Sequence, residues 1–102
     1  MQLTIRFSGA YHLSPLAEAD LEDIWLYTFQ TWSSEQADKY HRAMVSTFEA
    51  LASSRKQGRV VDVRPRYFKE RSGSHMIYFR RVESKIEIMR VLHGRMDDDR
   101  NL

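Results

Sequence analysis

The sequence contains no cysteine, two prolines, four glycines and no long apolar run. Without cysteine there is neither a disulfide nor a thiolate metal site, so we expect the cytoplasm as its compartment. No stretch approaches the roughly 18 apolar residues of a membrane-spanning helix. The segment from Met1 to Phe7 lacks a charged stretch followed by an apolar one, so we expect no secretory signal.

Several kinds of catalytic and cofactor site are missing as well. The four histidines, His12, His41, His75 and His93, show no metal-ligand spacing, and neither HExxH nor His-x-His occurs. There is also no glycine-rich phosphate loop and no serine nucleophile elbow. We therefore predict no metal, no cofactor, and no nucleotide or serine-hydrolase site.

A chain of 102 residues forms one domain with one modest core. Its net charge of +2 conceals a strong asymmetry. Residues 1–54 carry three basic and seven acidic side chains, a net charge of −4, whereas residues 55–102 carry thirteen and seven, a net charge of +6. Such polarity attracts an anionic partner. Alternatively, the helices simply hold the acids and the strands the bases.

Two helices are predicted after a short strand at residues 11–13. Ser14-Pro15 is a helix start, and apolar residues then recur at helical spacing. Ser34 is expected to cap a second helix with its own apolar face, and the connection is short enough to make an αα-hairpin. The two expected faces comprise Ala17, Leu21, Ile24, Trp25, Thr28 and Trp32, then Ala37, Tyr40, Met44, Phe48, Leu51 and Ala52.

Three strands are predicted after the hairpin, at residues 67–71, 75–82 and 86–92, with a turn at Ser72-Gly73 and a reversal at Glu83-Ser84. Such short links require an antiparallel meander. Residues 97–100 are expected to add a helical turn. The order is β-α-α-β-β-β, which predicts an α+β fold with an antiparallel sheet packed on the hairpin.

Basic residues gather in the predicted sheet region. We expect them on the strands or at their ends: Arg64, Arg66, Lys69, Arg71, Arg80, Arg81, Arg90, His93 and Arg95. A metal-independent ribonuclease needs such cations together with a general acid or base. Arg71, Arg80, His93 and Arg95 are the residues here that suit this role. The alternative is that the arginines pair with helix acids or with a partner's acidic tail.

The aromatic residues of the first helix have two readings. Trp25 and Trp32 are expected to be core or hairpin contacts rather than a ligand site. Tyr27 and Phe29 lie off the main apolar stripe. They either widen the buried face or form an exposed patch for a partner helix.

Three segments together resemble a known family. YHLSPLAEADLEDIW at 11–25 is similar to the opening of ParE-type toxins, in the RelE/ParE superfamily of type II toxin–antitoxin modules. GSHMIYF at 73–79 resembles that family's central strand, and VLHGRMD at 91–97 resembles its C-terminal signature. The resemblance covers residues 11–102 as one toxin domain and leaves residues 1–10 as an N-terminal extension.

The resemblance implies a bacterial toxin that inhibits DNA gyrase without being an enzyme and that a cognate antitoxin neutralises by direct binding. The antitoxin would be ParD-like or similar, with a disordered acidic or polar C-terminal segment. No membrane partner and no sequence-specific nucleic-acid binding are expected. The RelE branch instead cleaves mRNA on the ribosome, typically with a C-terminal tyrosine or histidine–tyrosine. This chain has no tyrosine after Tyr78, which favours the ParE branch.

Site residues follow from the resemblance combined with side-chain chemistry. We expect toxicity toward gyrase to depend on Arg90, His93, Gly94, Arg95 and Met96. We expect the antitoxin to cross the helical hairpin and run along the basic sheet. Its predicted contacts are Leu21, Trp25, Tyr27, Phe29, Arg71, Tyr78 and Arg80. The alternatives are a ribosome-dependent endoribonuclease and a non-toxic co-repressor that binds its antitoxin.

Overall fold

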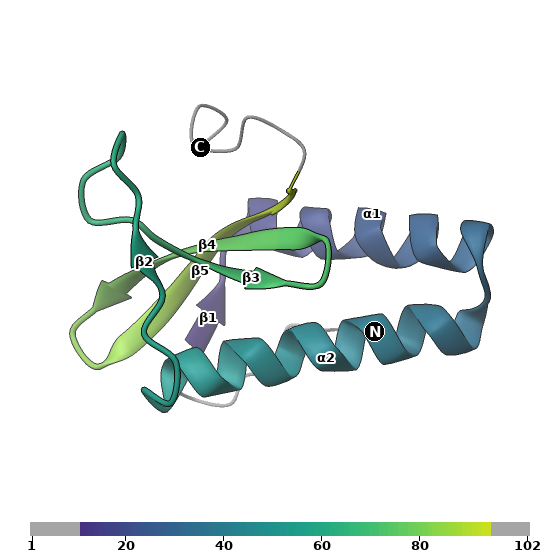
Figure 1. The fold of residues 1–102 in the computed structure, drawn as a ribbon, viewed down its shortest axis with the longest axis horizontal. Coiled ribbons are helices and arrows are strands. Elements are labelled where there is room, and N and C mark those ends of the chain that lie inside the picture. The colour runs from purple at the N-terminus through teal and green to yellow at the C-terminus, as the bar shows by residue number, and fades with distance from the viewer. Residues whose placement is uncertain (1–10, 95–102) are drawn as a thin grey trace.

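The computed structural model describes residues 11–94 and has two helices and five strands in this part of the chain. The elements are β1 (Tyr11–Leu13), α1 (Pro15–Thr31), α2 (Ser34–Ala52), β2 (Arg59–Val60), β3 (Phe68–Ser72), β4 (His75–Val82) and β5 (Lys85–His93). Figure 1 shows the helices running antiparallel as a hairpin beside the sheet. The α+β fold and the hairpin are confirmed. The N-terminal extension at 1–10 and the helical turn at 97–100 lie outside the described residues.

Both helices begin at a serine cap. The Ser14 hydroxyl accepts a hydrogen bond from the Ala17 N–H at 3.0 Å, and proline follows at the first helical position. The cap of α2 is Ser33, which accepts from the Gln36 N–H at 3.1 Å, so the prediction of Ser34 was wrong by one residue. Adjacent serines are equivalent in sequence, and the extended backbone of Ser33 decides between them.

The sheet has the order β1-β5-β4-β3-β2. Strands β3, β4 and β5 form the predicted antiparallel meander. Two features go beyond the prediction. β1 pairs with β5 in parallel, which makes the sheet mixed, and the short β2 extends the sheet beside β3. A two-residue strand has no recognisable period, so only its pairing partner defines it.

The core lies between the sheet and the hairpin. Ala17 and Leu21 of α1 pack there, together with four predicted residues of α2: Ala37, Met44, Phe48 and Leu51. The opposite face of the sheet holds a smaller buried cluster, Val61, Met76, Tyr78 and Leu92, with Tyr67 packed against it. The segment between β2 and β3 supplies Val61 and Tyr67 and therefore covers this second face.

Trp32, expected to be a core or hairpin contact, does not join the core. It is the residue at which α1 ends, and it is 69% exposed. Trp25 is a hairpin contact as predicted, because its indole N–H donates to Asp38 of α2 at 3.1 Å. Arg64 and Arg66, expected on the strands or at their ends, both lie in the connection between β2 and β3.

A β-bulge interrupts the pairing of β4 with β5 between Tyr78 and Phe79. Phe79 pairs with Ile88, but Tyr78 pairs with Arg90, so Met89 is the extra residue on β5. Beyond the bulge every pair is displaced by one position, and His75 comes directly opposite His93. Without the bulge, His93 would not face His75 across the ladder.

Candidate functional site

An open groove lies between α1, the start of α2, the start of β4 and the end of β5. Its volume is about 710 Å³. Its walls carry both aromatic and ionisable side chains: Asp20, Asp23, Tyr27, Trp32, Tyr40, His75, Arg90 and His93. Tyr27 and Trp32 are 66% and 69% exposed, so two large rings face solvent along this groove. Exposed aromatic rings beside polar groups are typical of protein-binding surfaces.

Two histidines and a tyrosine meet at the sheet end of the groove. The rings of His75 and His93 lie edge to face with centroids 5.3 Å apart. On the other side of His75, the Tyr40 Oη lies 2.7 Å from Nδ1. The side chains of Tyr40, His75 and His93 therefore form a continuous row that links α2, β4 and β5.

The Tyr40 hydroxyl also holds the turn between β3 and β4. It accepts a hydrogen bond from the Ser74 N–H at 2.8 Å and lies 3.3 Å from the Ser72 carbonyl. Gly73, between them, has a φ of +61°, and a Cβ added there would lie 2.5 Å from the Tyr40 Oη. Only glycine suits both the backbone and the space, so the turn can close onto the tyrosine.

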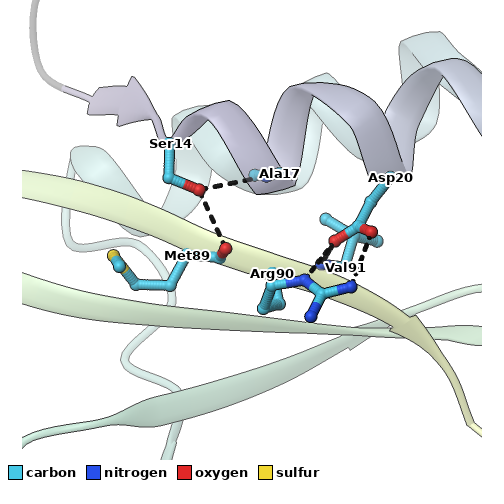
Figure 2. A network of polar contacts seen from close by, with 6 residues as sticks. All are labelled: Ser14, Ala17, Asp20, Met89, Arg90 and Val91. Atoms are coloured by element: carbon cyan, nitrogen blue, oxygen red, sulfur yellow. Dashed lines mark hydrogen bonds and ion pairs between the residues drawn. The ribbon is translucent and has the colours of Figure 1, made fainter. Parts of the chain in front are cut away.

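An ion pair fixes the other side of the groove, as Figure 2 shows. Asp20 of α1 accepts two hydrogen bonds from the Arg90 guanidinium, at 2.8 and 2.9 Å, and one from the Val91 N–H at 2.9 Å. Nearby, the Ser14 hydroxyl donates to the Met89 carbonyl at 2.9 Å. Both contacts fall at the bulge, so the irregular part of β5 is where α1 is attached to the sheet.

The charges of the site follow from these contacts. Burial lowers the pKa of His75, the neighbouring His93 lowers it further, and Asp20 opposes both effects. Hydrogen bonding to Asp20 raises the pKa of Arg90, which stays charged. His75 is therefore held toward its neutral form, in a groove that also contains the Arg90–Asp20 ion pair and the exposed carboxylate of Asp23.

Some of the predicted antitoxin contacts are exposed and others are buried. Tyr27, Phe29 and Arg71 are exposed, and Trp25 stacks on Phe29 with ring centroids 5.2 Å apart. Leu21 and Tyr78 are 3% and 0% exposed, so the prediction that they contact a partner is corrected. Leu21 belongs to the core under the hairpin and Tyr78 to the cluster on the opposite sheet face.

The predicted ribonuclease residues are not brought together. Arg71 lies beside Gly94 at the histidine end, since a Cβ on that glycine would be 3.2 Å from Nη1. Arg80 instead pairs with Glu87 at 2.6 Å, toward the other end of the same strands. Arg95 lies outside the described residues. The cluster proposed for catalysis is therefore corrected, because Arg80 serves the opposite end of the sheet.

Of the predicted toxicity residues, Arg90 and His93 line the groove, and Gly94 follows directly. Arg95 and Met96 lie outside the described residues. Sequence reasoning missed Tyr40 and His75 as members of this site. Tyr40 was placed on the apolar face of α2, and the pairing of the histidines depends on a bulge that no motif marks.

A metal ion and a membrane each require particular features of a protein. Within residues 11–94, no group of three or more His, Asp or Glu side chains is arranged to hold a metal ion. Among the same residues, no helix has the length and apolar character that crossing a membrane requires.

The helical hairpin on a mixed sheet defines a RelE/ParE-like α+β domain. A solved structure described as the chromosomal ParDE TA system from P. aeruginosa is similar, with a TM-score of 0.72 over 82% of this chain and 94% of that chain, at 20% identity. The model of the ParE toxin of the type II toxin–antitoxin system parDE matches residues 11–98. The chain belongs to this family and is a ParE-type toxin of a type II toxin–antitoxin system.

Two relatives support this assignment. Toxin ParE1 of Mycobacterium tuberculosis (strain H37Rv) is 43% identical over 97 residues, covering 93% of this chain and 99% of the relative. Toxin ParE1 of Caulobacter vibrioides is 42% identical over 88 residues, covering 85% and 91%.

Proposed function

We propose that this chain inhibits DNA gyrase as a binding protein in the cytoplasm, and that a ParD-like antitoxin neutralises it by direct contact. One observation carries the proposal. Arg90 and His93, expected to matter for toxicity, lie in the same groove as Tyr27, which was expected to contact the antitoxin. A single antitoxin segment in this groove would cover both surfaces, so neutralisation would need no change in the toxin's fold.

The groove suits an extended or helical protein segment better than a small substrate. It is open, and its exposed aromatic rings could become the buried anchors of a protein interface once a partner covers them. A disordered antitoxin segment could order along it and along α1, burying a large area as it folds.

The test is to express this chain without its antitoxin and to assay purified gyrase. Loss of supercoiling with accumulation of cleaved DNA supports the proposal, and co-expression of the adjacent gene's product should restore supercoiling. Unchanged supercoiling at stoichiometric toxin would contradict gyrase inhibition. Arg90→Gln and His93→Gln should weaken inhibition, whereas His12→Gln, at an exposed position on β1, is the matched control.

A second candidate is ribosome-dependent mRNA cleavage. The contact of Tyr40 with His75 favours it, because it supplies a tyrosine that the C-terminal sequence lacks. Cut mRNA soon after induction, lost in both His93→Ala and Tyr40→Phe, would favour this function over gyrase inhibition. Harmless expression without antitoxin would instead favour the co-repressor.

A further inference from the structure

The hydrogen bonds around His75 can accommodate either its neutral or its protonated form. Toxin neutralisation alone does not require this feature. While His75 is neutral, the Tyr40 hydroxyl can donate to Nδ1 across 2.7 Å and accept from the Ser74 N–H. When His75 is protonated, Nδ1–H can donate to Tyr40, whose proton then turns toward the Ser72 carbonyl at 3.3 Å. Neither state leaves the Tyr40 hydroxyl or Nδ1 without a partner.

We infer that His75 and His93 form a carboxylate-binding site that takes up a proton when an acidic side chain of the protein partner enters the groove. The inference rests on the proposed antitoxin binding and names the chemistry of one contact. A carboxylate between the two adjacent imidazoles would offset the repulsion that opposes charging His75 beside His93 in the free toxin. Binding and protonation therefore reinforce each other.

The charged groups around the pair are consistent with this role. Arg71 of β3 lies beside Gly94 but is not among the residues that line the groove, whereas Arg90 of β5 lines it and is compensated by Asp20. Tyr40 of α2 contacts His75 directly. Asp23 of α1 is exposed on the groove wall. An incoming carboxylate thus meets the adjacent imidazoles of His75 and His93, while the Arg90 guanidinium beside them is already held by Asp20.

A protein carboxylate fits this groove better than a nucleic-acid phosphate. Asp23 places an exposed carboxylate along one wall, and it would repel a polyanionic backbone that follows the groove. A peptide can direct one acidic side chain at the histidines and apolar side chains at Tyr27 and Trp32. The mixed lining therefore indicates a segment with isolated acidic residues between apolar ones.

The experiment is calorimetric titration of the full chain with the product of the adjacent gene, between about pH 8 and about pH 6, in two buffers of different ionisation enthalpy. Wild-type toxin should take up close to one proton, and affinity should rise by up to about tenfold per pH unit as the pH falls. His93→Gln, at an exposed position, should still bind but lose most of this pH dependence. His75→Gln should do the same, and His12→Gln should behave as wild type.

On the partner, one Asp→Asn or Glu→Gln substitution should abolish the same proton uptake. Combined with His93→Gln in the toxin, that substitution should weaken binding no further than either change alone. Binding without proton uptake would overturn the inference and leave the proposed function intact, as would uptake that persists in both histidine variants. No binding at any pH would overturn the proposed function and this inference together. Stronger, histidine-dependent proton uptake with a duplex DNA or RNA oligonucleotide would overturn the choice of a protein carboxylate.

Discussion

Asp20→Asn removes the charge that attaches α1 to β5 while keeping the size of the side chain. In the wild type, Asp20 accepts three hydrogen bonds, two of them from Arg90 and one from the backbone of Val91 (Figure 2). The amide can retain only part of this set, because its NH2 group is a donor facing donors. With its oxygen in the place of Oδ2, the amide can still accept from Arg90 Nε and the Val91 N–H, but Arg90 Nη2 loses its acceptor and the guanidinium loses its counter-charge.

The size of the effect follows from burial. The side chains of Asp20 and Arg90 are 13% and 27% exposed, so this ion pair is only partly buried. Fully exposed pairs contribute about 0–1 kcal/mol to stability, and breaking a buried pair costs about 3–5 kcal/mol. The Asp20–Arg90 pair should fall between these limits. We expect Asp20→Asn to lower the free energy of unfolding by about 2 kcal/mol. For a domain of this size, this corresponds to a decrease in Tm of roughly 10 °C.

The matched control is Glu87→Gln, which removes the acid of the more exposed Arg80–Glu87 pair. Its side chains are 40% and 32% exposed, so the expected loss is much smaller than that of Asp20→Asn and should shrink further at high salt. Urea unfolding followed by circular dichroism measures both variants. If Asp20→Asn costs no more than Glu87→Gln, the attachment of α1 through this pair is not a main source of stability, and the reasoning fails.

Three further predictions concern the turn and the histidines. Tyr40→Phe should cost about 1–2 kcal/mol in urea unfolding, because the Ser74 N–H loses its acceptor; an unchanged midpoint would contradict this. Gly73→Ala should cost at least about 2 kcal/mol, since the backbone is left-handed and the new methyl meets the Tyr40 ring; wild-type stability would show that the turn can shift. Burial lowers the pKa of both His75 and His41, so their contribution to stability is complete above about pH 6.5 and is lost as the pH falls below it. Unfolding midpoints from about pH 7.5 to about pH 5 should show this, and His75→Gln should reduce the slope.

The groove contains residues expected to matter for toxicity, Arg90 and His93, together with Tyr27, which is expected to contact the antitoxin. Arg90 serves the stability of the fold through Asp20, and it also lines the surface proposed for partners. A loss of toxicity in an Arg90 variant must therefore be compared with its loss of stability. His93, which is exposed at the end of β5, is the cleaner probe of function.

The sequence by itself determined the helical hairpin, the meander and the charge asymmetry. These features depend on contacts within a few residues: Ser14-Pro15 starts a helix, apolar residues recur at helical spacing along α2, and tight reversals join β3, β4 and β5. Its family segments also sufficed to predict ParE membership, which the family match confirmed.

Only the tertiary structure decided which residues form the groove. Tyr40 reaches His75 because the hairpin packs on the sheet, and His93 faces His75 because one bulged residue shifts the register. Tyr78 is buried in the folded chain and so is not on the surface. The pairing of β4 with β5 puts Arg80 opposite Glu87, several residues along the strands from His93. Contacts between distant segments depend on how the elements pack and pair, and a local pattern contains no information about a partner far along the chain.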